Sequence, residues 1–397
     1  PCLGAVVNVK LMNMKKVAAG LLVLAAAWGF SACSSEKAVI EQELKQMTLQ
    51  EKVGSMFFVR PEVLDTDIYY DSPSVLKSFD VHEVTDKMKE TARVYPMGGV
   101  ILFSHNIKDP QQLSQFIKDL RALPSQPLLC IDEEGGSVAR LANNPNFHLP
   151  KFANMGTLAA SGRTKEVTEA ATTIGEYLKN YGFDIDFAPV ADVNTNPRNV
   201  VIGARAFSNE PKVAAEMVKA YLKGLQKSGV IGCLKHFPGH GDTQADSHFG
   251  YAMSRKTWEE IRDCEMIPFK AGMEAGAQMI MTAHISLPNV TGSNVPSTLS
   301  PMILQEKLRG ELGYKGLIIT DAMEMGAILR QYPVEDAAIM AIKAGVDVLL
   351  CVREYPKVFD AVLNAVRRGE IPESRIDESV RRILKLRHRS ITYGDKK

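Results

Sequence analysis

The chain has 397 residues, of which 45% are hydrophobic and 23% charged, and its formal net charge is +1. This is the composition of a globular protein with enough apolar material for a large core. A charge so close to neutral gives no support for a nucleic-acid partner, and no long run of like charge indicates a tail. The length fits two or three average domains, but a single α/β barrel can account for most of it.

Residues 1–33 are predicted to be a leader and lipoprotein signal peptide, with the natural start at Met14. A basic start, Met14-Lys15-Lys16, precedes an apolar stretch at 17–29 that is too short to span a bilayer and is typical of a secretory signal. Ser31-Ala32-Cys33 then resembles the bacterial lipoprotein signal, in which Cys33 becomes lipidated. The alternative is that the apolar stretch itself is retained as a membrane anchor. We expect the protein to be exported and attached to a membrane of the cell envelope (periplasm or outer membrane) by a lipid at Cys33.

After a linker at residues 34–40, a regular alternation of elements begins and continues to residue 392, before a short tail at 393–397. The first element is an expected helix at 40–52, whose second half Thr48 can cap. Short apolar runs then predict eight strands, at 56–60, 99–103, 127–132, 184–190, 230–236, 279–285, 317–323 and 346–352. Segments of helical period lie between most of them and after the last, at 110–123, 165–181, 211–227, 256–275, 301–312, 355–368 and 372–387.

Strands that alternate with helices predict a parallel sheet with right-handed crossovers, and eight strands are the number that closes into a barrel. The expected fold is therefore a (β/α)8 TIM barrel forming a single catalytic domain at residues 41–392, with an open doubly wound sheet as the competing architecture. Reactive residues of such barrels lie where the strands end. Five successive predicted strands end in polar residues: Asp132, Asp192, Lys235 with His236, His284, and Asp321.

The segment after the fifth strand is rich in titratable residues and too rich in Gly and Pro for a helix. In an extended segment, Asp246 and His248 point the same way, so that the carboxylate can orient the imidazole and raise its pKa towards neutrality. This pair is a candidate proton donor. Asp321, a lone carboxylate in an apolar strand, is either a nucleophile or the cap of a following helix. A carboxylate nucleophile with a general acid is the basic requirement of retaining glycoside hydrolysis.

Other patterns point to weaker alternatives. His236, His240, Asp242 and His248 are residues of metal-binding type, but no H-x-H or H-E-x-x-H spacing is present, so we expect no metal. Arg140 and Arg205 lie close in sequence to the rim motifs and are candidates for holding ligand hydroxyl, carbonyl or carboxylate groups. We expect structural roles for four polar residues near these motifs, Glu133, Glu134, His240 and Glu324.

The run Lys-His-Phe-Pro-Gly-His-Gly-Asp-Thr at 235–243, followed by Asp246-Ser247-His248, resembles the motif of glycoside hydrolase family 3, and more narrowly of its β-N-acetylglucosaminidase branch. The resemblance covers nearly the whole mature chain. Its other motifs are Met-Thr-Leu-Gln-Glu-Lys-Val-Gly (47–54), Ile-Asp-Glu-Glu-Gly-Gly (131–136), Phe-Ala-Pro-Val-Ala-Asp-Val (187–193), Ile-Gly-Ala-Arg-Ala-Phe (202–207) and Thr-Asp-Ala-Met (320–323). The family fold is a (β/α)8 barrel.

The resemblance implies roles for individual residues. Asp321 matches the nucleophile, and the Asp246–His248 dyad matches the general acid/base that this branch uses. The positions that match the family's sugar-binding residues are Asp132, Arg140, Arg205, Lys235 and His236. We therefore expect a cofactor-free monomer that hydrolyses terminal β-linked N-acetylglucosamine from peptidoglycan fragments, as in peptidoglycan turnover, or from other glycans.

Several alternatives stay open on the sequence. A phosphorylase or a β-glucosidase of the same family would share the same barrel chemistry. Phosphorolysis is open because a neutral histidine base repels an anionic attacker, such as phosphate, less than a carboxylate does. A metal-dependent hydrolase or a non-catalytic glycan-binding lipoprotein would belong to a different class. Binding alone needs no nucleophile, so the Asp321 and Asp246–His248 set argues against the last of these.

Overall fold

The computed structural model describes residues 36–67, 80–245 and 252–394. The chain divides into two units, residues 1–47 and residues 48–397. In the first unit, residues 36–46 form a helix. The strands of the described chain all belong to the second unit.

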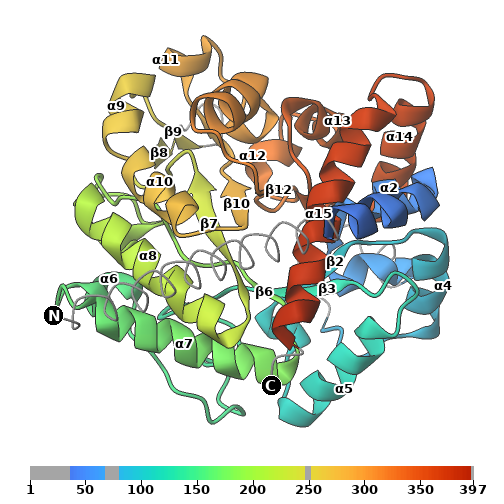
Figure 1. Ribbon diagram of the computed structural model, residues 1–397, viewed down its shortest axis with the longest axis horizontal. Coiled ribbons are helices and arrows are strands. Elements are labelled where there is room, and N and C mark those ends of the chain that lie inside the picture. Colours follow the sequence, from blue (N-terminus) through green and yellow to red (C-terminus); the bar gives the residue numbers. More distant parts are fainter. Residues whose placement is uncertain (1–35, 68–79, 246–251, 395–397) are drawn as a thin grey trace, which may run out of the picture. The chain divides into compact units, whose positions relative to one another are not determined.

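Eight parallel strands form the central sheet of the second unit (Figure 1). In chain order they are β1 (Phe57–Val59), β2 (Gly99–Leu102), β3 (Leu128–Ile131), β6 (Ile185–Asp186), β7 (Ile231–Phe237), β10 (Met279–Thr282), β12 (Leu317–Thr320) and β13 (Leu349–Leu350). Each of the eight predicted strands overlaps one of them. Every neighbouring pair is parallel, and the chain of pairs runs from β12 through β10, β7, β6, β3, β2 and β1 to β13.

The sheet closes almost completely on itself between its two end strands. Ile319 of β12 bridges Val348, directly before β13, and the Thr320 N–H donates to the Val348 carbonyl at 3.0 Å. The Thr320 hydroxyl then accepts the N–H of Leu350 at 2.9 Å. The predicted α/β barrel is confirmed, and the open doubly wound sheet is wrong, because an open sheet would leave these end strands unpaired.

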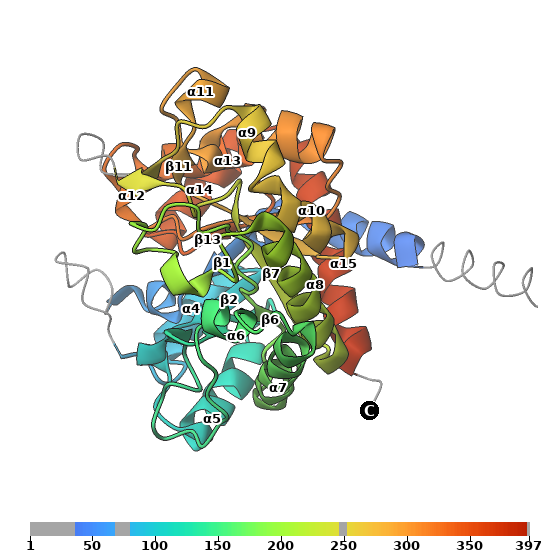
Figure 2. The same ribbon diagram turned by 90° about the vertical axis from the view of Figure 1, so that its left-hand side faces the viewer.

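Helices surround this barrel (Figure 1), and α8 packs against β7, with α7 and α10 packed on α8 (Figure 2). The longer ones are α4 (Asp86–Val94), α5 (Pro110–Arg121), α7 (Thr164–Tyr181), α8 (Pro211–Ser228), α10 (Met266–Glu274), the π-helix η5 (Met302–Glu311), α13 (Val334–Ala344), α14 (Tyr355–Arg367) and α15 (Glu373–Gly394). The shorter ones are α2 (Leu49–Ser55), η1 (Pro61–Leu64), η2 (Ser104–Asn106), α6 (Met155–Ala159), η3 (Gly203–Arg205), α9 (Trp258–Asp263), α11 (Pro288–Thr291), η4 (Ser297–Leu299) and α12 (Gly326–Leu329).

Two predicted helices are each divided in the structure. The helix expected at residues 40–52 ends at 46, and α2 begins at Leu49. Thr48 caps α2 as expected, because its side chain accepts the Glu51 N–H and Glu51 accepts the Thr48 N–H, a capping box that starts a new helix. The helix expected at 256–275 breaks at Cys264, whose φ of −129° is not helical. Pro268 then lies in the first turn of α10, where a proline is tolerated.

A buried carboxylate fixes the C-terminal helix to the end of the barrel opposite the predicted active site. Asp347 is fully buried just before β13 and accepts from Arg309 at 2.6 Å and from Arg382 of α15 at 2.8 Å. It also accepts the Ser379 hydroxyl at 2.7 Å and the Ile318 N–H at 2.9 Å. One side chain therefore joins α15, η5 and the first residues of two strands.

Replacement of Asp347 by Ala should be strongly destabilising, because it leaves the half-buried Arg309 and Arg382 without the buried carboxylate that both bind. Loss of one partner of a buried ion pair costs about 3–5 kcal/mol, and we expect chemical denaturation to show a loss of this size. Glu169→Ala is the matched control, since Glu169 forms an exposed 3.6 Å pair with Lys165 and such pairs contribute about 0–1 kcal/mol. Equal effects of the two substitutions would contradict this account of Asp347.

Candidate active site

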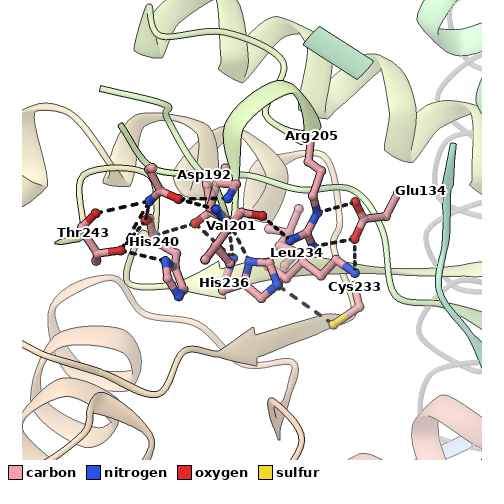
Figure 3. Close-up of polar contacts among 12 residues, drawn as sticks. Glu134, Asp192, Val201, Arg205, Cys233, Leu234, His236, His240 and Thr243 are labelled. Carbon is pink, nitrogen blue, oxygen red and sulfur yellow. Dashed lines mark hydrogen bonds and ion pairs between the residues drawn. The ribbon is translucent and has the colours of Figure 1, made fainter. Parts of the chain in front are cut away.

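A continuous network of charges links the ends of β3 and β7. Asp132 follows β3, and its carboxylate accepts from Lys235 of β7 at 2.9 Å and from Arg140 at 3.3 Å. The Lys235 ammonium also contacts the Glu134 carboxylate at 2.5 Å. Arg205 then binds Glu134 through two hydrogen bonds, of 2.9 and 2.7 Å, as Figure 3 shows. Four of the five predicted sugar-binding residues therefore lie in one network.

Glu134 also belongs to this network, although the sequence indicated a structural role for it and did not place it among the site residues. The sequence contained a signal for this contact, namely the alternation of side chains along a strand. Residues 133–135 form the strand β4, paired with β5 (Val138–Ala139), and side chains alternate along a strand, so that Asp132 and Glu134 point one way and Glu133 the other. Glu133 is indeed structural, since it accepts from the Tyr177 hydroxyl and two backbone N–H groups.

The network keeps its buried groups charged. Burial alone would raise the pKa of Asp132, but the charges of Lys235 and Arg140 lower it to about 2. Burial would likewise raise the pKa of Glu134, and Lys235 and Arg205 lower it below its usual range. The pKa of Lys235, which burial would lower, is raised by the two carboxylates. All three groups are therefore ionised at neutral pH.

His236, the fifth predicted sugar-binding residue, lies at the same end of β7 and is held by Asp192 (Figure 3). The His236 Nδ1 lies 2.7 Å from the Asp192 carboxylate, so Nδ1 carries a proton and donates it to this carboxylate. Asp192 is fully buried and also accepts the His240 N–H at 2.6 Å. Burial would raise the pKa of Asp192, but His236 and His240 lower it.

Asp321 follows β12 directly and is partly exposed at the same rim. One of its carboxylate oxygens accepts the Ala322 N–H at 2.8 Å. The next helix, α12, begins only at Gly326, with Met325 at its cap position, so Asp321 does not cap it. His284, which follows β10, contacts the Ala322 carbonyl through Nε2 at 3.0 Å. Burial lowers the pKa of His284, so its ring is neutral and Nε2–H donates to this carbonyl.

Three predicted site residues, Asp246, His248 and Cys33, lie outside the described residues. The segments on either side of the dyad are described: β8 (Gln244–Ala245) pairs with β9 (Ala252–Met253), and β9 pairs with β11 (Ile285–Ser286), next to His284. In the part of the chain that the structure describes, no group of three His, Cys, Asp or Glu side chains is arranged to hold a metal. No described helix is long and apolar enough to cross a membrane.

An eight-stranded α/β barrel with paired carboxylates, cations and an aspartate that caps no helix at its rim places polar side chains where enzymes of this fold have their active sites. The chain belongs to glycoside hydrolase family 3, since residues 40–386 match the model of the glycosyl hydrolase family 3 N terminal domain. This family assignment agrees with the motifs at 131–136, 235–243 and 320–323.

Comparison with individual relatives indicates the class of glycoside hydrolase. A beta-hexosaminidase of Stenotrophomonas maltophilia is 34% identical over 72% of this chain and 84% of its own length. Beta-hexosaminidase A of Pseudoalteromonas piscicida is 32% identical over 76% of this chain, which spans only 55% of that relative. A solved family 3 beta-N-acetylglucosaminidase of Paenibacillus matches 87% of this chain and 63% of its own, with 34% identity and a TM-score of 0.77. These relatives support a glycoside hydrolase of the β-N-acetylhexosaminidase type.

The ion pairs of Lys235 predict a pH-dependent effect of Lys235→Met on stability. A carboxyl group whose pKa is lowered by folding stabilises the fold above its ordinary pKa, and this contribution is lost as the pH falls through the folded value. For Asp132 this window runs from 3.8 down to about 2. The destabilisation caused by Lys235→Met should therefore be largest above pH about 4 and shrink towards pH about 2, measured by denaturant titration at each pH.

Lys89→Met is the control for this experiment, because Lys89 forms an exposed pair with Asp86. It should show little effect at any pH. A destabilisation by Lys235→Met that does not change with pH would mean that packing, and not charge, accounts for the role of Lys235.

Proposed function

We propose that this chain is a retaining β-N-acetylglucosaminidase that releases terminal β-linked N-acetylglucosamine through a covalent glycosyl-aspartate. The observation that carries the proposal is the placement of Asp321: it follows a barrel strand, is partly exposed at the rim and caps no helix. The names of the relatives supply the sugar. The whole catalytic unit is proposed to be the single barrel domain at residues 41–392.

In the proposed mechanism, the Asp321 carboxylate attacks the anomeric carbon while His248 donates a proton to the leaving oxygen. A water molecule, deprotonated by His248, then releases the sugar with retained configuration. Asp246 would orient the histidine and keep it protonated before the first step. The strands β8 and β9 border this segment and pair with each other. The pairing of β9 with β11, next to His284, supports a place for the dyad near the strand ends.

The charge network is proposed to bind the sugar. The oxygens of Asp132 and the donors of Arg140, Arg205 and Lys235 suit the hydroxyl groups of a pyranose, and His236 adds a ring nitrogen. Because these side chains already hold one another, they lose little freedom when the sugar binds, which favours affinity. We further propose that Cys33 is lipidated and that the enzyme acts at the cell envelope on peptidoglycan fragments or other glycans.

The first test compares 4-nitrophenyl β-N-acetylglucosaminide with the matching β-glucoside, using the full chain and the variant Asp321→Asn. We expect a strong preference for the N-acetyl substrate. Asp321→Asn should lower kcat by at least about 10³-fold, because an amide cannot form the glycosyl ester. Proton NMR of the first product should show the β-anomer.

Two outcomes would overturn parts of this proposal. Preference for the glucoside would reassign the substrate, and an active Asp321→Asn variant would exclude Asp321 as the nucleophile. Release of sugar 1-phosphate in high phosphate would show that phosphate, and not water, attacks the intermediate.

His248→Ala tests the proton donor through the leaving group. A nitrophenolate needs little protonation, whereas the alcohol leaving group of N,N′-diacetylchitobiose needs a full proton. We expect the variant to lose at least about 10²-fold more rate on chitobiose than on 2,4-dinitrophenyl N-acetylglucosaminide when the first step is measured. His82→Ala, a substitution far from these motifs in sequence, is the control. Equal losses on both substrates would exclude His248 as the acid.

A further inference from the structure

We infer that Arg60, directly after β1, is a positioning residue. It fixes the segment that carries Asp321 (residues 321–325) relative to the Arg140–Asp132 pair on the other side of the rim. The inference rests on the proposed function, which assigns Asp321 to the reaction and Asp132 to sugar binding. The residues that carry it are Arg60, Phe103, Arg140 and Glu324. Neither Arg60 nor Phe103 belongs to the motifs from which the site was predicted.

On one side, Arg60 holds the segment that carries the proposed nucleophile. Its Nη1 donates to the Glu324 carboxylate at 2.7 Å, and Glu324 lies three residues after Asp321. The same segment is held by the Met323 N–H, which donates to the Leu350 carbonyl at 2.8 Å, and by His284 on the Ala322 carbonyl. Arg60 therefore adds a further attachment, from a strand that does not neighbour β12 in the sheet.

On the other side, Arg60 acts through an aromatic ring. The guanidinium carbons of Arg60 and Arg140 lie 5.3 and 5.6 Å from the centroid of the Phe103 ring. Arg140 holds Asp132 through one hydrogen bond of 3.3 Å, and its buried Nε has no hydrogen-bond partner in the described parts of the chain. The Phe103 ring, which Arg60 also contacts, therefore constrains the Arg140 guanidinium further.

Arg60 is itself held by two carboxylates of the protein. Its Nε donates to Glu62 at 3.3 Å, Nη1 to Glu324, and Nη2 lies 3.3 Å from His105. Glu62 is in turn held by His105 at 2.6 Å and by Asn106 at 2.8 Å. The Arg60 side chain is 19% exposed, so these pairs are only partly screened by water. A side chain held by two carboxylates in this way is suited to orient its neighbours.

The two sides can be separated by kinetics. Glu324→Gln loosens only the nucleophile segment and should lower kcat about 10-fold with little change in KM. Phe103→Leu loosens only the Arg140–Asp132 side and should mainly raise KM. Arg60→Met removes the shared attachment and should do both, lowering kcat/KM by about 10–100-fold, since small displacements of reacting groups have effects of this size. Arg60→Lys keeps the charge and should restore part of kcat.

A second measurement does not depend on activity. The N–H groups of Asp321, Ala322, Met323 and Met325 are all hydrogen-bonded, so their amide hydrogens should exchange slowly. We expect hydrogen–deuterium exchange of a peptide covering 321–325 to be faster in Arg60→Met and Glu324→Gln. Arg121→Met is the matched control: Arg121 pairs with the buried Asp184 at 2.8 Å, away from the rim, and should change neither this exchange nor kcat.

The results distinguish the inference from the function on which it rests. If the wild-type chain does not act on N-acetylglucosaminides, the proposed function fails, and the exchange experiment still tests whether Arg60 holds the segment. If exchange at 321–325 is unchanged in Arg60→Met, the positioning role is wrong, whatever the substrate. Equal kinetic effects of Arg60→Met and Arg121→Met would also overturn it, since they would indicate a general loss of stability.

Discussion

The rim of this barrel depends on one buried cation placed between two carboxylates. Lys235 is 2% exposed and contacts Asp132 and Glu134, which follow a different strand. Buried charges are stable only when they are paired and hydrogen-bonded, so each of the three groups requires the other two. Arg140 and Arg205 complete the arrangement by binding the carboxylate oxygens from outside. The ends of β3 and β7 are thereby held together by charge as well as by the sheet.

The two ends of the barrel use the same physical device for different purposes. At the end opposite the rim, Asp347 and Asp184 are buried carboxylates whose oxygens are occupied by arginine, serine and backbone donors. These contacts attach α15 to the strands. At the rim, the paired carboxylates of Asp132 and Glu134 lie with the lysine and the arginines that are proposed to bind the sugar. The same kind of pair therefore stabilises the fold at one end and positions polar side chains at the other.

The sequence predicted the barrel well because its strands are short apolar runs whose number and alternation decide the topology. It placed Asp132, Lys235, His236 and Asp321 at one rim because parallel strands bring their carboxyl ends together. It did not predict the contacts of Glu134, Arg60 and Glu324. The Glu134 contacts follow from side-chain alternation within β4, but the Arg60–Glu324 pair joins residues 264 positions apart, from strands that are not neighbours. Only the closure of the barrel decides that these two side chains meet.

The distribution of charge over the rim also separates Asp321 from the other carboxylates. Asp132, Glu134 and Asp192 each contact at least one cationic or histidine side chain, whereas among the described residues no cation forms an ion pair with Asp321. A close cation would lower the energy of the carboxylate and weaken it as a nucleophile. The backbone N–H of Ala322 orients one oxygen of Asp321 without adding a full charge. The cations of the rim are thus committed to the groups that would bind the sugar, and in the described parts of the chain none of them pairs with Asp321, the group that would attack it.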